Sequence, residues 1–136
     1  NKFAVVKKIL LRNNRDIGIL LTNGINEITM ATILDTYSRT FPASFRTYVL
    51  NDSVIVTKYG LTLIYTGKND VKGLDELHLA TPASFSNAEA IYFKGVKTVK
   101  YDSIQHGYLF NICLNRIGVQ YGKSFEKFVK ISLDYN

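Results

Sequence analysis

The stretch "DIGILLTNGINEI", residues 16–28, decides the fold class. Its first half is a short apolar run, which is typical of a buried strand, and Asn23-Gly24 is a turn signal. Asn26 is placed to cap a helix that Pro42 ends, and the apolar positions of that helix recur at helical spacing: Ile28, Ala31, Leu34, Tyr37 and Phe41. A strand that leads directly into a helix predicts a fold built from strand–helix units.

The middle of the chain continues this pattern. Residues 44–51 and 74–81 are predicted to be strands, and residues 54–68 supply two strand pieces around a Tyr59-Gly60 turn. Residues 91–104 are expected to be extended in part. Strands that alternate with helices indicate an α/β fold whose sheet is mainly parallel.

Two helices are predicted near the end of the chain. The first has an apolar face followed by Gly122 at its C-terminal turn, and that face consists of Phe110, Cys113, Leu114, Ile117 and Tyr121. The second is expected to begin with Ser124 as its cap, and its face consists of Phe125, Phe128, Val129, Ser132 and Leu133.

Composition and charge limit the class of protein. With 136 residues, 46% of them hydrophobic and 21% charged, the chain suits one globular domain. It contains no apolar run long enough for a transmembrane span and no recognisable signal peptide. The net charge of +6 comes largely from the first fifteen residues, which hold five positive charges and no acid. We therefore expect a basic arm over residues 1–15 and a single domain over residues 16–136.

The basic arm leaves partners and compartment open. It could contact nucleic acid or anionic lipid, but no nucleic-acid-binding signature accompanies it, so a nucleic-acid partner is not favoured. The chain begins without Met, which is consistent with an upstream segment outside this sequence. A cytoplasmic location is the expectation, and anchoring to a membrane through such a segment is the alternative.

The order of these segments resembles a known family. "RDIGILLTNGINEITMATILDTYSRTF", "FRTYVLNDSVIVTKYGLTLIYTGK" and "LDELHLATPAS" together resemble the amino-terminal half of the ThiJ/PfpI group of the class I glutamine amidotransferase-like superfamily. The tail over residues 107–135 resembles the ending of some members. The resemblance covers residues 15–85 and 107–135. It implies a flavodoxin-like three-layer α/β sandwich with a mainly parallel central sheet and two C-terminal helices.

The residues that the resemblance implies for catalysis are not found. Active members carry a cysteine on a strand-to-helix elbow, whereas Cys113 is predicted to lie on the apolar face of a helix as a core residue. Ala83 and Ser84 stand where the family has glycines that shape an oxyanion site. The supporting acid would fall at Thr29, and Glu27 is displaced from that place by two positions. The family's activity is therefore predicted to be absent.

Other catalytic and metal sites have weak support. Ser103, with His106 close in sequence, is the best alternative nucleophile, but no glycine precedes it as an elbow requires. His78 is expected to project from the opposite face of its strand to its leucine neighbours, towards a crevice or a covering helix. Two histidines without a carboxylate pair do not predict a metal site, and no phosphate-binding glycine motif predicts a cofactor.

The favoured function is a non-catalytic module for ligand sensing or protein interaction. Because ligands of open α/β sheets bind at the carboxyl ends of the strands, the expected ligand-binding residues are Asn23, Gly24, Glu27, Thr81, Ala83 and Ser84. One alternative is a diverged hydrolase or amidase that uses Ser103, His106 or Glu27. A second alternative is a nucleic-acid-associated domain that uses the basic arm. The aromatic residues could also supply a homodimer interface.

Overall fold

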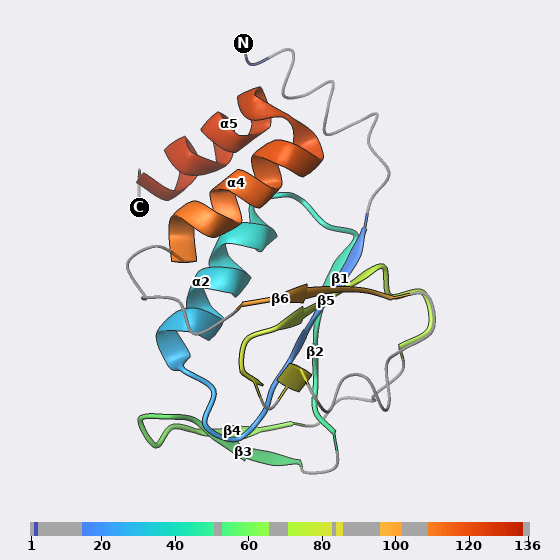
Figure 1. Cartoon of the computed structure of the whole chain (residues 1–136), viewed down its shortest axis with the longest axis vertical. Coiled ribbons are helices and arrows are strands. Elements are labelled where there is room, and N and C mark those ends of the chain that lie inside the picture. Colours follow the sequence, from blue (N-terminus) through green and yellow to red (C-terminus); the bar gives the residue numbers. More distant parts are fainter. Residues whose placement is uncertain are drawn as a thin grey trace.

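The chain folds into strands and helices in the order expected of an α/β protein. The computed structural model describes residues 2, 15–50, 53–65, 71–82, 84–85, 96–101 and 109–134. Its elements, labelled in Figure 1, are β1 (Asp16–Leu20), α2 (Glu27–Ser38), β2 (Ser44–Tyr48), β3 (Val54–Val56), β4 (Thr62–Ile64), β5 (Glu76–Leu79), β6 (Lys97–Lys100), α4 (Leu109–Tyr121) and α5 (Lys123–Asp134).

The central sheet is parallel throughout its described part. Its four strands lie in the order β2-β1-β5-β6, and Ile17 of β1 pairs with Phe45 of β2 and with Glu76 of β5. Strands β3 and β4 form a separate antiparallel hairpin near the carboxyl end of β1 (Figure 1). The α/β class, the parallel sheet and the hairpin are therefore confirmed.

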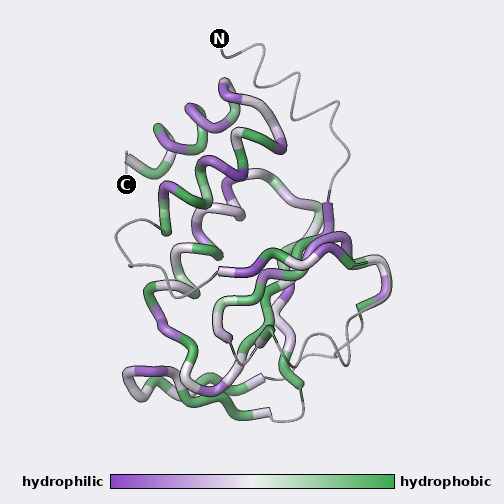
Figure 2. The backbone as a smooth tube through the Cα atoms, viewed as in Figure 1, coloured by the Kyte–Doolittle hydropathy of each residue, from purple (hydrophilic) through white to green (hydrophobic). Residues whose placement is uncertain are grey.

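Apolar residues cover both faces of the sheet. The three helices α2, α4 and α5 lie together on one face (Figure 1), where the core includes Ile19, Ile33, Tyr37, Ile117 and Phe125. A second cluster on the other face joins Leu20, Tyr48, Leu74, Leu77 and Leu79, with Phe85 packed against it. Figure 2 shows the consequence: β1 is largely apolar, while polar and apolar residues alternate along α4 and α5.

The start of α2 follows the prediction, and its buried face follows it in part. Asn26 caps the helix, since its side-chain oxygen accepts hydrogen bonds from the backbone N–H groups of Ile28 and Thr29 at 2.9 and 3.1 Å. Ile28, however, is 57% exposed, and Phe41 lies beyond the end of the helix at Ser38. Tyr37 is buried as predicted, Leu34 packs against the core, and the other buried residues are Thr29, Ile33 and Thr36. The prediction was wrong at Ile28, Ala31 and Phe41, because the helix turns Thr29, Ile33 and Thr36 towards the core in their place.

The C-terminal helices confirm the predicted faces. In α4 the side chains of Cys113, Leu114 and Ile117 are buried, and Gly122 turns the chain with a φ of 95°. The prediction that Ser124 caps α5 was wrong, because the helix already begins at Lys123. The carbonyl of Gly122 accepts hydrogen bonds from the backbone N–H groups of Phe125 and Glu126 in the first turn of α5. None of the described helices is long and apolar enough to cross a membrane.

Gly18 provides a test of the packing around β1. A Cβ atom there would lie 2.6 Å from Cε2 of Tyr48 and 3.2 Å from Cδ1 of Leu74. Gly18→Ala should therefore lower the free energy of unfolding by about 1–3 kcal/mol, measured by urea denaturation. Gly118→Ala is the matched control, because its Cβ meets only the flexible ends of the Glu126 and Lys123 side chains. Equal effects of the two substitutions would contradict this packing.

Candidate functional site

The carboxyl ends of β1 and β5 are joined by a cluster of hydroxyl groups. Thr22 follows β1, and its Oγ1 lies 2.8 Å from Oγ1 of Thr81 and 3.1 Å from Oγ of Ser84. Thr81 and Ser84 are themselves 2.7 Å apart between these oxygens. Thr22 and Ser84 are buried. The structure thus brings Thr81 and Ser84 together, and these hydroxyls hydrogen-bond to one another.

Asn23, Gly24 and Glu27 form a second group, which holds the β3–β4 hairpin. The side-chain oxygen of Asn23 accepts a hydrogen bond from Val56 N at 2.9 Å, and Gly24 N donates to Val56 O at 2.8 Å. The carboxylate of Glu27 accepts hydrogen bonds from the Thr57 hydroxyl and from Tyr59 N. Burial acts to raise the pKa of Glu27, but these hydrogen bonds outweigh it and hold the pKa below its usual value. The ionised carboxylate therefore fastens the hairpin to the start of α2.

The remaining catalytic and ligand-binding candidates cannot be placed. Ala83, Ser103 and His106 lie outside the described residues. Within the described part of the chain, no group of three or more His, Cys, Asp or Glu side chains could hold a metal ion.

Cys113 is confirmed as a core residue. Its side chain is fully buried in α4. Burial raises the pKa of the thiol to about 11, although the Tyr101 hydroxyl and the Arg116 guanidinium act in the opposite direction. Because the thiolate is the nucleophilic form, this neutral, enclosed thiol is unsuited to the cysteine chemistry that the family resemblance implies.

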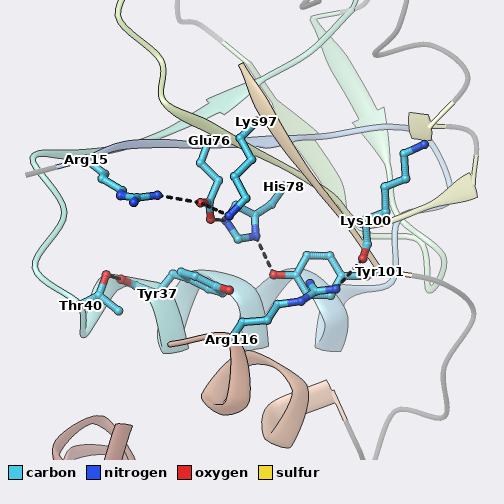
Figure 3. A network of polar contacts seen from close by, with 9 residues as sticks. All are labelled: Arg15, Tyr37, Thr40, Glu76, His78, Lys97, Lys100, Tyr101 and Arg116. Carbon is cyan, nitrogen blue, oxygen red and sulfur yellow. Dashed lines mark hydrogen bonds and ion pairs between the residues drawn. The ribbon is translucent and has the colours of Figure 1, made fainter. Parts of the chain in front are cut away.

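A buried chain of polar side chains crosses the helix-covered face of the sheet. His78 of β5 has no exposed surface; its Nε2 lies 2.8 Å from Oε1 of Glu76 and its Nδ1 lies 2.6 Å from the Tyr101 hydroxyl (Figure 3). Burial lowers the pKa of His78 despite the opposing effect of Glu76, so the ring is neutral. Since an ionised carboxylate only accepts, Nε2–H donates to Glu76 and Nδ1 accepts from Tyr101.

Glu76 carries the negative charge of this chain. Its Oε2 lies 3.6 Å from Nη1 of Arg15 and 3.9 Å from Nζ of Lys97. Burial acts to raise the pKa of Glu76, but the hydrogen bond from His78 and the nearby positive charges lower it below its usual value. Glu76 is therefore an ionised carboxylate with almost no contact with solvent.

Aromatic and cationic groups enclose the other end of the chain. Tyr37 of α2 meets the His78 ring edge to face, with 4.4 Å between ring centroids. Burial raises the pKa of both Tyr37 and Tyr101, so both are neutral phenols. The Arg116 guanidinium of α4 lies 4.7 Å from the centre of the Tyr101 ring, and its Nη2 donates to the carbonyl of Lys100 at 3.0 Å.

A cavity of about 590 Å³ opens beside this network, between β6 and α4. Its lining includes Tyr37, Glu76, Lys97, Asn115, Arg116 and Val119. A volume of this size is typical of small-molecule sites, and titratable groups with perturbed pKa values often mark such sites.

Sequence reasoning missed this cavity and most of the network. It did predict that His78 faces a covering helix, which the contact with Tyr37 confirms. Glu76 lies two residues before His78, so the two share one face of a strand, and that spacing was the one available signal. Their partners Arg15, Tyr101 and Arg116 come from distant parts of the chain, and no local pattern links them.

Solved structures of known proteins share this fold. The AraC family transcriptional regulator from Pseudomonas putida aligns with a TM-score of 0.65 and 12% identity, covering 88% of this chain and 99% of that one. Drosophila melanogaster DJ-1beta aligns with a TM-score of 0.64 and 10% identity, covering 89% of this chain and 98% of that one. Oxidized DJ-1 from Toxoplasma gondii aligns with a TM-score of 0.60 and 13% identity, covering 88% of this chain and 98% of that one. The flavodoxin-like fold implied by the family resemblance is therefore confirmed.

Comparisons at the level of sequence found no match. No protein-family model matches the chain, and no curated protein matches it. Identities this low establish the shared fold and no shared activity.

The neutral state of His78 gives a prediction about pH. Because burial holds its pKa below the usual 6.5, the unfolded chain takes up a proton below that pH that the folded chain does not. Stability should therefore fall as the pH falls below that value, by up to about 1.4 kcal/mol per pH unit. Urea denaturation between about pH 5 and 7.5 measures this slope.

Two comparisons assign the slope to His78. His78→Gln should flatten it, while His106 is present in both proteins and contributes equally. If that variant does not fold, an NMR titration of the His78 ring in the wild-type protein gives the same information. A ring that becomes protonated in the folded state near pH 6.5 or above would refute the assignment.

Proposed function

We propose that this chain is a ligand-binding module with a DJ-1-type fold, and that it does not use a cysteine nucleophile. The observation that carries this proposal is the cavity between β6 and α4, whose size suits a small molecule. The network behind it supplies walls whose polar groups are held in fixed positions by hydrogen bonds and ion pairs.

The state of the candidate catalytic groups favours binding over catalysis. Cys113 is buried and neutral, and the carboxylate of Glu27 is occupied by the hairpin. His78 has both ring nitrogens bonded and no exposed surface, so it cannot reach a substrate. One protein with this fold is named as a transcriptional regulator, which is consistent with a role in sensing.

This proposal moves the ligand away from the place that the sequence favoured. At the strand ends, Asn23 and Glu27 are bonded to the hairpin, and Thr81 and Ser84 to the hydroxyl cluster. The cavity instead lies on the helix-covered side of the sheet. Binding at the strand ends, and hydrolysis through Ser103 and His106, stay as alternative predictions.

Blocking the cavity tests the proposal. A metabolite screen by thermal shift should find a compound that raises the Tm of the wild-type protein by about 9 °C when its concentration is about a hundred times its Kd. Val119→Trp and, separately, Asn115→Trp should abolish that shift by filling the mouth of the cavity. Ile131→Trp is the matched control, since Ile131 is exposed on α5 outside the cavity. Compounds whose effect survives both cavity substitutions would refute this location.

A second candidate function, self-association, is favoured by the outer face of the hairpin. Val54 pairs with Ile64 across the two strands, so both side chains point to the same side, as does that of Val56. These three residues are 46%, 72% and 48% exposed in that order. A two-stranded sheet with a bare apolar face is a natural surface for a second copy of the chain.

Charge substitution on the hairpin tests this candidate. Sedimentation velocity should detect a dimer of the wild-type protein, and Ile64→Lys should shift it to monomer because a buried lysine in the interface is costly. Ile131→Lys provides the control at an exposed apolar position on α5. A wild-type monomer, or equal dissociation by both variants, would contradict self-association through the hairpin.

A further inference from the structure

We infer that the ligand of the β6–α4 cavity is a small monocarboxylate with an apolar body. This inference rests on the proposed function, because it names the class of molecule that the same cavity takes. Three features of the lining carry it: an excess of positive charge, a positioned guanidinium, and apolar walls beside one buried carboxylate.

The charge of the lining is positive. Among the described residues around the cavity, Lys97 and Arg116 contribute positive charge and Glu76 negative charge, whereas the Lys100 ammonium lies over the Phe85 ring on the other face of the sheet. The charge of Glu76 is already offset by Arg15, whose Nη1 lies 3.6 Å from Oε2, and by Lys97 at 3.9 Å. A bound anion would therefore enter a region in which positive charge is in excess.

Arg116 supplies a cation held in one orientation. Its guanidinium packs over the Tyr101 ring at 4.7 Å, and its Nη2 donates to the carbonyl of Lys100. Within the described part of the chain, no carboxylate forms an ion pair with Arg116, and its buried Nη1 has no hydrogen-bond partner. A positioned guanidinium without a carboxylate partner suits recognition of an external carboxylate.

The remaining lining limits the anion to one charge and favours an apolar body. Tyr37, Val99 and Val119 contribute apolar surface, which would be left bare by a small inorganic ion. Because Arg15 and Lys97 already offset Glu76, the positive charge left over in the lining is that of Arg116, which balances a monoanion but not a dianion such as phosphate. A carboxylate group placed near Arg116 and Lys97, with its hydrocarbon part against these side chains, satisfies both features.

Pairs of carboxylates and their amides test the class of ligand. The wild-type protein, labelled with ¹⁵N, would be titrated with acetate, butanoate, hexanoate and benzoate, with the primary amide of each, and with inorganic phosphate. Binding is followed through the amide signals of Asn115 and Val119. At least one carboxylate with an apolar body should bind about tenfold more tightly than its amide, and phosphate should bind more weakly than that carboxylate.

Variants assign the effect to the two cations. Arg116→Gln should weaken carboxylate binding by about tenfold and leave binding of the amide nearly unchanged, Arg116→Lys should lose less, and Lys97→Gln should lose about threefold. Lys130→Gln removes the same charge from an exposed position on α5 and should have little effect. If Arg116→Gln fails to fold, the comparison of acid with amide on the wild-type protein still decides the question.

The outcomes separate this inference from the proposed function. Equal binding of carboxylates and amides, tighter binding of phosphate, or equal losses in the Arg116 and Lys130 variants would overturn the monocarboxylate class and leave the cavity as a ligand site. If the thermal-shift screen also yields no compound that depends on the cavity, the proposed function and this inference fail together.

Discussion

The buried charge of Glu76 is the constraint on which the rest of the structure depends. Glu76 lies on β5, a strand whose residues are all buried, and an ionised carboxylate in such a place must be matched by nearby donors and cations. The chain meets this need with His78 on the same strand, Arg15 before β1 and Lys97 on β6. One carboxylate thereby links three neighbouring segments of the sheet, and His78 extends the link to Tyr101.

This arrangement has a consequence for where the chain can act. At the strand ends, the polar groups that the sequence assigned to ligand binding are bonded to one another or to the hairpin. Two cationic residues of the network, Lys97 and Arg116, line the cavity between β6 and α4, and Arg116 is fixed against Tyr101. Chemistry that needs an accessible thiolate is not available from Cys113. The proposed ligand site therefore lies between β6 and α4, and not at the carboxyl ends of the strands where the sequence placed it.

Local signals predicted the fold well and the cavity hardly at all. The Asn26 cap, the face of α4 and the strand pattern around residues 16–22 are properties of short segments, and the structure confirms them. The predicted face of α2 was right at Tyr37 and wrong at Ile28, because tertiary packing buries Thr29, Ile33 and Thr36 instead. The contact of Glu76 with Arg15 depends on β1 lying beside β5, and that of His78 with Tyr101 depends on the register of β5 against β6. No short stretch of the sequence encodes either arrangement.

Hydrogen–deuterium exchange with a ligand bound distinguishes the β6–α4 cavity from the strand ends, because it reports which edge of the sheet the ligand covers. The tightest compound from the screen would be added at saturation, and exchange of backbone amides compared with that of the free protein. Binding in the β6–α4 cavity predicts added protection at residues 97–101 and 115–120, with residues 22–27 and 81–85 unchanged. Protection confined to residues 22–27 and 81–85 would contradict it and return the ligand to the strand ends.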